Sequence, residues 1–199
     1  MANATIEDAL LDITQQLTRL RVPCALVGGL AVSIRAEVRF TRDVDVAVVV
    51  SDDAHTEWLV RELRMVRYSP VTLVEHDERH RIATVRLRSP SGFVVDLLGA
   101  TCGIEAEIVA RATLISIGTI GDVRVARAEE LLAMKVLSMS ERRLQDTIDA
   151  RNLLEELDAV ALEAVTENLK MVTARGYGRG QDLLAKLDAL VAANRDSDQ

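Results

Sequence analysis

The chain has 199 residues, of which 49% are hydrophobic and 28% are charged, a composition typical of a globular protein with a substantial core. Its formal net charge of −7 argues against a broad basic surface for nucleic acid, and we expect no DNA partner. Aromatic residues make up only 3% of the chain, which leaves little material for stacking on bases. No apolar run approaches the roughly 20 residues of a membrane span, and the N-terminus lacks the order of a signal peptide, so we expect a cytoplasmic protein without a membrane partner.

The hydrophobic pattern changes near residue 126. Before this point helical and strand-like segments alternate, and after it the period is helical throughout. We expect helices at 6–20, 30–37 and 105–112, another helix after Asp52, and strands at 25–27, 44–50, 71–74, 82–87, 93–98 and twice within 113–125. Later helices are expected at 128–139, from a cap at Ser140 to about 157, at 162–171 and at 182–192. The pattern predicts an α+β core at 1–126, a helical region at 127–193 and a disordered tail at 194–199.

Two glycines, Gly28 and Gly29, follow the short apolar strand at 25–27. Glycine lets the backbone turn tightly, and the segment after the pair is compatible with a helix. Backbone amides at a helix N-terminus favour an anion. The glycine pair therefore suits a phosphate.

Two carboxylates, Asp43 and Asp45, open an apolar, β-branched segment that is typical of a buried strand. Because side chains alternate along a strand, both aspartates point to the same side. Like charges this close repel unless a cation lies between them, and Mg²⁺ takes oxygen ligands from carboxylates and from a triphosphate. An isolated D-x-D pattern is also typical of strand-edge acids, but the glycines before it and the buried strand after it favour a metal site.

Asp96 is a further acid inside the otherwise apolar segment 93–98. A buried lone carboxylate is costly, so Asp96 needs a partner. Hydrogen bonds from backbone amides at a strand end are one way to satisfy it.

The polar segment 75–81, E-H-D-E-R-H-R, lies between two expected strands. Its histidines, His76 and His80, are residue types that bind metals, but no third ligand lies at a suitable spacing. We expect a solvated hairpin tip here.

The glycine pair, followed after thirteen residues by D-V-D-V, resembles the signature of the nucleotidyltransferase superfamily related to DNA polymerase beta. The longer pattern of G-G-L-A-V, Arg39, Thr41, Asp43 and Asp45 is similar to the minimal nucleotidyltransferases of the AbiEii type, which include the MenT toxins of toxin–antitoxin systems. The resemblance implies a polymerase beta-like core, with a mixed sheet and flanking helices, followed by a C-terminal helical bundle. It also implies that Asp96 is the third acid of the site.

A second segment, 129–153, resembles the AbiEii-type segment in which a lysine is followed, one helix later, by an arginine and Asp-x-x-Asp. The corresponding residues are Lys135, Arg142 or Arg143, Asp146 and Asp149. Gln145 occupies a position where a lysine is common in the family, which weakens the assignment of the arginine. From the residue alone, a lysine in an apolar helix more often extends its amine to solvent, and it is the surrounding segment that favours a place in the site. The roles of Arg142, Arg143 and Asp149 are left open.

The resemblance implies an enzyme that transfers a nucleoside monophosphate from an NTP and releases pyrophosphate. Asp43 and Asp45 would hold Mg²⁺ in a two-metal site, with Asp96 as a third ligand or as acceptor of the attacking hydroxyl's proton. Asp146 would orient Lys135 or the acceptor. The residues expected to be catalytic are therefore Asp43, Asp45, Asp96, Lys135 and Asp146.

The same resemblance implies a set of nucleotide-binding residues. The amides of Gly28 and Gly29 would hold the β- and γ-phosphates, with Arg39 and Thr41 beside them. Lys135 would neutralise charge on the triphosphate, because phosphoryl transfer depends chiefly on positioning and electrostatics.

The resemblance to MenT enzymes also implies an acceptor and a partner. The acceptor would be the 3′ end of tRNA, modified with a pyrimidine nucleotide from CTP or UTP so that aminoacylation is blocked. A cognate antitoxin would neutralise the toxin, with phosphorylation of Thr41 by a kinase-type antitoxin as one route. Several arginines either contact phosphates around the cleft or form ordinary solvated surface, namely Arg35, Arg39, Arg42, Arg79, Arg81, Arg86 and Arg88.

Two other functions stay open at this point. One is nucleotide transfer to a hydroxyl of a protein or of a small molecule such as an aminoglycoside. The other is a non-catalytic interaction module, although three clustered acids have no purpose in a scaffold.

Overall fold

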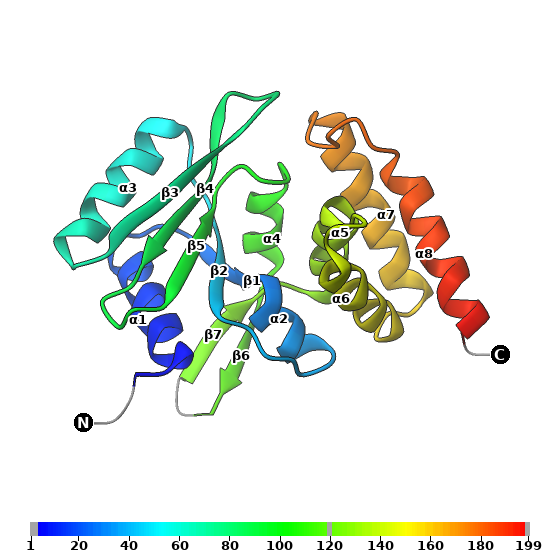
Figure 1. Ribbon diagram of the computed structural model, residues 1–199, viewed down its shortest axis with the longest axis horizontal. Coiled ribbons are helices and arrows are strands. Elements are labelled where there is room, and N and C mark those ends of the chain that lie inside the picture. Colours follow the sequence, from blue (N-terminus) through cyan, green and yellow to red (C-terminus); the bar gives the residue numbers. More distant parts are fainter. Residues whose placement is uncertain (1–3, 119–120, 198–199) are drawn as a thin grey trace.

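A seven-stranded mixed sheet dominates the N-terminal part of the molecule (Figure 1). The computed structural model describes residues 4–118 and 121–197, and the strand order is β3-β4-β5-β2-β1-β7-β6. The strands are β1 (Cys24–Val27), β2 (Asp43–Val48), β3 (Ser69–His76), β4 (Arg81–Arg88), β5 (Val94–Leu98), β6 (Thr113–Ile117) and β7 (Gly121–Val125). The predicted α+β class with a mixed sheet is confirmed.

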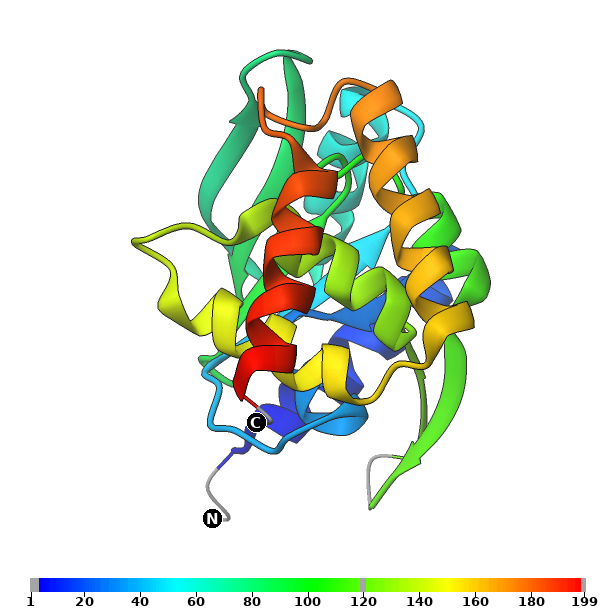
Figure 2. The ribbon, with the colours of Figure 1, turned by 90° about the vertical axis from the view of Figure 1, so that its right-hand side faces the viewer.

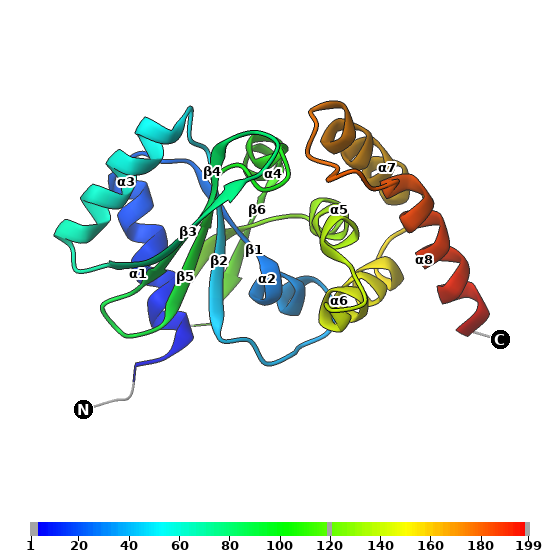
Figure 3. The same ribbon diagram turned by 45° about the horizontal axis from the view of Figure 1, so that its top comes forward.

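Helices flank the sheet and then form the C-terminal part of the chain. They are α1 (Ile6–Arg19), α2 (Gly28–Arg35), α3 (Asp53–Met65), α4 (Glu105–Arg111), α5 (Ala128–Ser138), α6 (Leu144–Glu155), α7 (Ala159–Ala174) and α8 (Leu183–Ser197). In Figures 1 and 3, α1 and α3 lie together on one side of the sheet, whereas α5 to α8 lie on the other. The predicted helical C-terminal region is therefore present.

The first and third helices begin where side-chain caps predict. Thr5 and Asp8 form a reciprocal capping box at α1, and Asp52 accepts a hydrogen bond from the His55 amide at α3. Such caps satisfy amides that the first helical turn leaves without partners. The acidic pair at Asp52 and Asp53 is thus a helix start, as expected.

β2 lies at the centre of the sheet, between β1 and β5. It pairs with β1 in the antiparallel sense and with β5 in the parallel sense, and Asp45 stands opposite both Val27 and Asp96. On the next strand, Arg86 stands opposite Asp96. Directly opposed residues have Cβ atoms about 5 Å apart. The register therefore places Arg86, Asp96 and Asp45 in one row across three strands.

α5 joins the two parts of the chain, because it packs against α2 as well as against α6 and α7. Figure 2 shows α8 lying across α5 and α6, and α8 contacts both. The division of the chain into units at residues 126 and 127 stays a prediction.

Several helix limits differ from the expectation, among them those of α6 and α8. α6 begins at Leu144 rather than at a Ser140 cap, because the Arg143 amide bonds to the Ser140 carbonyl at 2.9 Å and closes a separate turn. α8 continues to Ser197, so the expected disordered tail is wrong for residues 194–197. The alanines at 192 and 193 favour continuation of the helix. Residues 198 and 199 of that tail lie outside the described residues.

Within residues 4–118 and 121–197, every helix is too short or too polar to cross a membrane.

Candidate active site

A cavity of about 970 Å³ lies between the sheet and the C-terminal helices. Its walls come from the acids of β2 and β5, from the start of α2, from the β3–β4 hairpin, and from α5 and α6. Every residue that the sequence predicted for catalysis or nucleotide binding lines it: Gly28, Gly29, Arg39, Thr41, Asp43, Asp45, Asp96, Lys135 and Asp146. The structure thus brings together residues from both parts of the chain.

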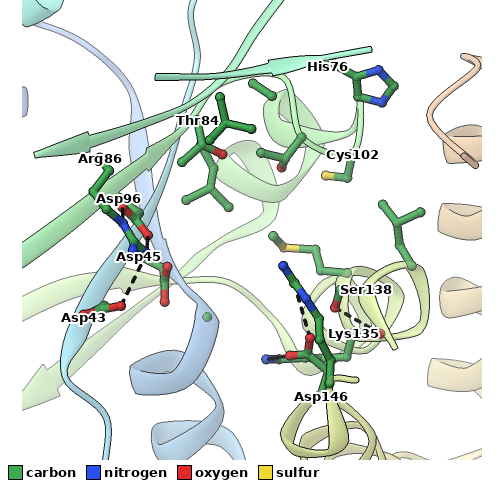
Figure 4. A pocket seen from close by; sticks show the side chains of 18 of the residues that line it. Asp43, Asp45, His76, Thr84, Arg86, Asp96, Cys102, Lys135, Ser138 and Asp146 are labelled. Carbon is green, nitrogen blue, oxygen red and sulfur yellow. Dashed lines mark hydrogen bonds and ion pairs between the residues drawn. The ribbon is translucent and has the colours of Figure 1, made fainter. Parts of the chain in front are cut away.

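The three acids lie on the sheet wall of this cavity (Figure 4). Asp43 and Asp45 are partly buried and share one face of β2, while Asp96 is only 6% exposed on β5. The backbone register sets Asp96 beside Asp45. The predicted clustering of the three aspartates is therefore present in the structure.

Gly28 allows Asp45 to occupy this place. Its φ angle is +64°, a conformation that other residues rarely adopt. A Cβ atom at Gly28 would also overlap the Asp45 carboxylate. Both the conformation and the close approach therefore require glycine here.

The start of α2 already holds an anion of the protein itself. The helix begins at Gly28, two residues earlier than expected, and the Gly29 amide forms a hydrogen bond with the Asp45 carboxylate. A carboxylate at a helix N-terminus is stabilised by the local amides and dipole. An incoming phosphate at this helix end would therefore lie beside Asp45.

Asp45 is the carboxylate of the acid cluster whose charged form is disfavoured by its surroundings. The pKa of Asp45 rises from 3.8 to about 7, chiefly because of burial and also because of the charges of Asp96 and Asp43, which outweigh the charge of Lys135 and the Gly29 hydrogen bond. Burial disfavours the charged form of a carboxyl group, and neighbouring negative charges add to that cost. A cation close to Asp45 would relieve it.

Arg86 is the direct partner of Asp96. Its Nε donates to Oδ1 of Asp96 at 2.9 Å and its Nη2 to Oδ2 at 2.6 Å, while Nη2 lies 3.5 Å from Oδ2 of Asp43. The hydrogen bonds with Asp96 raise the pKa of Arg86. From the sequence, Arg86 was only one of several arginines considered for phosphate contacts.

The acids suit a hard divalent cation. Asp43, Asp45 and Asp96 supply carboxylate oxygens from one cavity wall, which is the ligand type that Mg²⁺ prefers, with substrate phosphates and water completing its shell. Among residues 4–118 and 121–197, however, no three His, Cys, Asp or Glu side chains already form a metal-binding cluster. The bidentate contact with Arg86 uses both oxygens of Asp96.

The opposite wall of the cavity carries a second ion cluster, on α5 and α6 (Figure 4). Nζ of Lys135 lies 2.7 Å from Oδ1 of Asp146 and 2.8 Å from Oδ2 of Asp149. Lys135 and Asp146 retain exposed side-chain fractions of 11% and 16%, whereas Asp149 has none. The side chain of Lys135 thus faces the cavity and is held by two carboxylates, rather than extending into bulk solvent.

Asp149, whose role the sequence left open, is the centre of this second cluster. Nε of Arg39 lies 2.7 Å from its Oδ1, Nη2 of Arg39 donates to Oδ2 at 2.8 Å, and Gln145 donates to Oδ1 at 2.9 Å. Burial alone would raise the pKa of Asp149, but the hydrogen bonds from Arg39, Lys135 and Gln145 outweigh it and hold the pKa low. Asp149 therefore connects the segment before β2 with α5 and α6.

Arg39 and Thr41 lie beside the start of α2. A Cβ atom at Gly29 would be 2.6 Å from Nη2 of Arg39 and 3.0 Å from Oγ1 of Thr41. Thr41 is partly buried and precedes β2 by two residues. The hydroxyl of Thr41 thus lies within the cavity wall that carries Asp43 and Asp45.

The β3–β4 hairpin differs from the expected solvated tip. The strands extend into the segment 75–81, and His76 is only 7% exposed, with its ring 4.7 Å from that of Tyr177. The guanidinium of Arg79 also lies over the Tyr177 ring, 5.4 Å from the ring centre. The prediction is wrong for His76 because a distant loop, between α7 and α8, covers it.

Most of the arginines considered for phosphate contacts have other partners. Arg35 donates to the carbonyls of Val125 and Ala126, Arg81 pairs with Asp53, and Arg88 donates to the Gly92 carbonyl. Of the set, Arg39 and Arg86 line the cavity, together with Arg143 and Arg179 from the C-terminal part.

The sequence profile of the family described as "Nucleotidyl transferase AbiEii toxin, Type IV TA system" matches residues 13–198. The chain belongs to the AbiEii family. It is therefore a nucleotidyltransferase of the toxin–antitoxin class. A search of curated protein sequences gave no match.

Solved structures show the same fold. The antibiotic-resistance factor ANT(2'')-Ia is 15% identical, with a TM-score of 0.55 over 87% of this chain and 94% of that one. A nucleotidyltransferase-like protein from Paracoccidioides brasiliensis is 21% identical, with a TM-score of 0.54 over 92% of each chain. The lincosamide antibiotic adenylyltransferase LnuA is 16% identical, with a TM-score of 0.50 over 78% of this chain and 100% of that one. At these identities the likeness concerns the fold alone.

Replacing Gly28 should separate backbone strain from steric overlap. Gly28→Ala is expected to destabilise the protein by at least about 2 kcal/mol more than Gly92→Ala, because overlap with Asp45 adds to the strain of a positive φ. Gly92 is the matched control, since its φ is +92° and a Cβ atom there meets nothing within 4 Å. Urea unfolding measures both losses, and equal losses would contradict the close approach of Gly28 to Asp45.

The raised pKa of Asp45 should appear as pH-dependent stability in EDTA. Because the folded-state pKa of about 7 exceeds the unfolded value near 3.9, the folded state holds the extra proton between these values. This contribution is complete below about pH 4 and is lost as pH rises through 7, with a magnitude on the order of 2–4 kcal/mol. Asp45→Asn should lack this component in urea unfolding at pH 4–8. Parallel pH profiles for wild type and Asp45→Asn would contradict the assignment.

Proposed function

We propose that this AbiEii protein transfers a nucleoside monophosphate, preferably from CTP or UTP, to the 3′ end of tRNA, and that this blocks aminoacylation and translation. The observation that supports nucleotidyl transfer most directly is the single cavity with three carboxylates on one wall and Lys135 on the other. The choice of tRNA and of a pyrimidine nucleotide is supported by the resemblance of residues 28–45 to MenT enzymes. Arg143 and Arg179 on the cavity wall are available for the phosphates of an RNA end.

The acids of the sheet would act at the reacting phosphate. Asp43 and Asp45 would hold Mg²⁺, which would supply a Lewis acid for the phosphate oxygens. Asp96 would become a third ligand or accept the proton of the attacking hydroxyl once its oxygens leave Arg86. The Gly29 amide and the start of α2 would hold the acids and the triphosphate close together.

Lys135 would act on the triphosphate from the opposite wall. Its ammonium group is already positioned by Asp146 and Asp149, so little conformational entropy is lost when a phosphate approaches it. Asp146 is the more exposed of the two carboxylates and would be the one that yields to a phosphate oxygen. Asp149 would keep Lys135 and Arg39 in place. Phosphoryl transfer gains chiefly from such positioning of charge.

A toxin of this family implies an antitoxin partner. We propose that phosphorylation of Thr41 is one route of neutralisation. A phosphate on Thr41 would add nearly two negative charges to the cavity wall that already carries Asp43 and Asp45. Such charge would repel the triphosphate.

Labelled transfer tests the proposed reaction. The purified protein is incubated with Mg²⁺, total tRNA and each α-labelled NTP in turn, and label is expected on tRNA with CTP or UTP. Asp45→Asn should reduce transfer by about 10²-fold or more, because it removes a charge that acts on the reacting phosphate. Asp188→Asn, an exposed position on α8, is the matched control and should leave transfer unchanged.

Other acceptors are decided in the same experiment. Label on a protein band, or on an antibiotic added in place of tRNA, would keep the enzyme class and overturn the RNA acceptor. If neither wild type nor Asp188→Asn transfers label to any acceptor pool, the result would contradict nucleotidyl transfer.

Thr41 modification is tested by mass spectrometry. Protein co-expressed with the product of its neighbouring gene should gain the mass of one phosphate on Thr41, and its transfer activity should fall. Thr41→Val should prevent this modification. An unmodified Thr41 in a neutralised complex would exclude this route.

A further inference from the structure

Arg86 stands where the acid cluster requires a cation. The backbone register aligns it with Asp96 and Asp45 across β4, β5 and β2, and its side chain points toward Asp96 and Asp43 on the cavity wall (Figure 4). Three carboxylates on neighbouring strands repel one another unless positive charge lies among them. Without a metal ion, the guanidinium of Arg86 supplies that charge.

The contact with Asp96 is the strong, two-point form. Nε and Nη2 each donate to a different oxygen, at 2.9 and 2.6 Å, which is the fork geometry that favours arginine over lysine for carboxylates. Nη2 also lies 3.5 Å from Oδ2 of Asp43. One guanidinium therefore bridges two of the three acids, and it uses the oxygens of Asp96 that a metal ion would need.

We propose that Arg86 is a resident counter-ion of the acid cluster, which holds Asp96 in the metal-free protein and is displaced from Asp96 when a divalent cation binds. The inference rests on the metal site of the proposed function. It makes Arg86 a positioning residue that competes with the metal for a carboxylate.

The exposure of the two partners permits such an exchange. The Arg86 side chain is 43% exposed, whereas that of Asp96 is 9% exposed. Because the guanidinium already borders the open cavity, it can leave Asp96 for water without the large cost of stranding a buried charge. Asp96 cannot leave in the same way, and needs another cation when Arg86 moves. A divalent ion held by the same acids satisfies that need.

Arg88 provides a matched control on the same strand. It lies two residues further along β4 and therefore on the same face, but it is exposed and donates to the Gly92 carbonyl. Loss of either arginine changes the net charge by the same amount. A difference between Arg86→Gln and Arg88→Gln therefore reports the contact with the acids and not the overall charge.

Metal binding without nucleotide tests the inference. Mn²⁺ replaces Mg²⁺ in this experiment. It is titrated by isothermal calorimetry into the full-length wild type, Arg86→Gln and Arg88→Gln. We expect Arg86→Gln to bind Mn²⁺ about tenfold or more tightly than wild type, because a charge-assisted, two-point competitor is absent. Arg88→Gln should bind like wild type. Equal or weaker binding by Arg86→Gln would overturn the inference, as would an equal gain in Arg88→Gln.

Stability supplies a second readout on the same variants. In EDTA, Arg86→Gln should unfold at lower urea concentration than wild type, and saturating Mn²⁺ should raise its midpoint by more than it raises that of wild type. A purely structural arginine would give the loss in EDTA without the larger gain in Mn²⁺, and that result would contradict displacement. If Arg86→Gln does not unfold cooperatively, Arg86→Lys replaces it as the test of displacement, since lysine keeps the positive charge but cannot make the two-point contact with Asp96. Tighter Mn²⁺ binding by Arg86→Lys supports displacement, and unchanged or weaker binding overturns it.

Failure of this inference is distinguishable from failure of the proposed function. The titration contains neither NTP nor tRNA, so it reports the acids and Arg86 alone. If the wild type transfers label to tRNA, but Arg86→Gln binds Mn²⁺ no more tightly than the wild type, the proposed function is retained and displacement is rejected. Tighter Mn²⁺ binding by Arg86→Gln without transfer to any acceptor would do the reverse.

Discussion

The gathering of three carboxylates at the centre of one sheet is the constraint on which the rest of this structure depends. β2 is paired on both sides, so Asp43 and Asp45 cannot move apart, and the parallel register with β5 fixes Asp96 next to them. The protein offsets the repulsion with the Gly29 amide, the Arg86 guanidinium and the more distant charge of Lys135. These groups do not fully offset burial and repulsion, since burial, followed by the charges of Asp96 and Asp43, still raises the pKa of Asp45 to about 7. Residual unfavourable charge of this kind is typical of a site that binds a cation during its reaction.

Lys135 on α5 must also face these acids, although it belongs to a different part of the chain. The buried carboxylate of Asp149 holds Lys135 in this position, because it bonds to Arg39 and Lys135 together. Arg39 comes from the segment before β2, so one carboxylate fixes the distance between the sheet wall and the helical wall of the cavity. A buried ion pair adds little net stability by itself, but removal of one partner leaves an uncompensated charge. The network is thus better understood as a device that keeps the two walls in register than as a source of stability.

Much of this structure could be predicted from short-range patterns in the sequence. The glycine pair, the D-x-D at a strand start and the helices that begin at Ile6 and after Asp52 depend on short-range signals, and each is present where the sequence predicted it. What the sequence could not supply depends on which distant segments meet. The pairing of Arg86 with Asp96 follows from the β4–β5 register, and the burial of His76 follows from the α7–α8 loop that packs on it. The late start of α6 is a local exception, because the Arg143 amide closes a turn on the Ser140 carbonyl before the helix begins. Strand register and loop packing leave no periodic pattern in a single sequence.

The charges of the cavity also limit how a triphosphate can enter it. The protein carries a net charge of −7, and three cations that line the cavity already have close carboxylate partners: Arg86 with Asp96, Lys135 with Asp146 and Asp149, and Arg39 with Asp149. Arg179 also lines the cavity but donates to the Thr101 carbonyl. To bind at the three paired cations, an anionic substrate must exchange partners with these groups. The exchange is easiest where a partner is exposed, as for Arg86 and Asp146, and hardest at Asp149, whose side chain is fully buried. Nucleotide and metal would thus enter together, since the cation that satisfies Asp96 also neutralises the phosphates that draw Lys135 from Asp146.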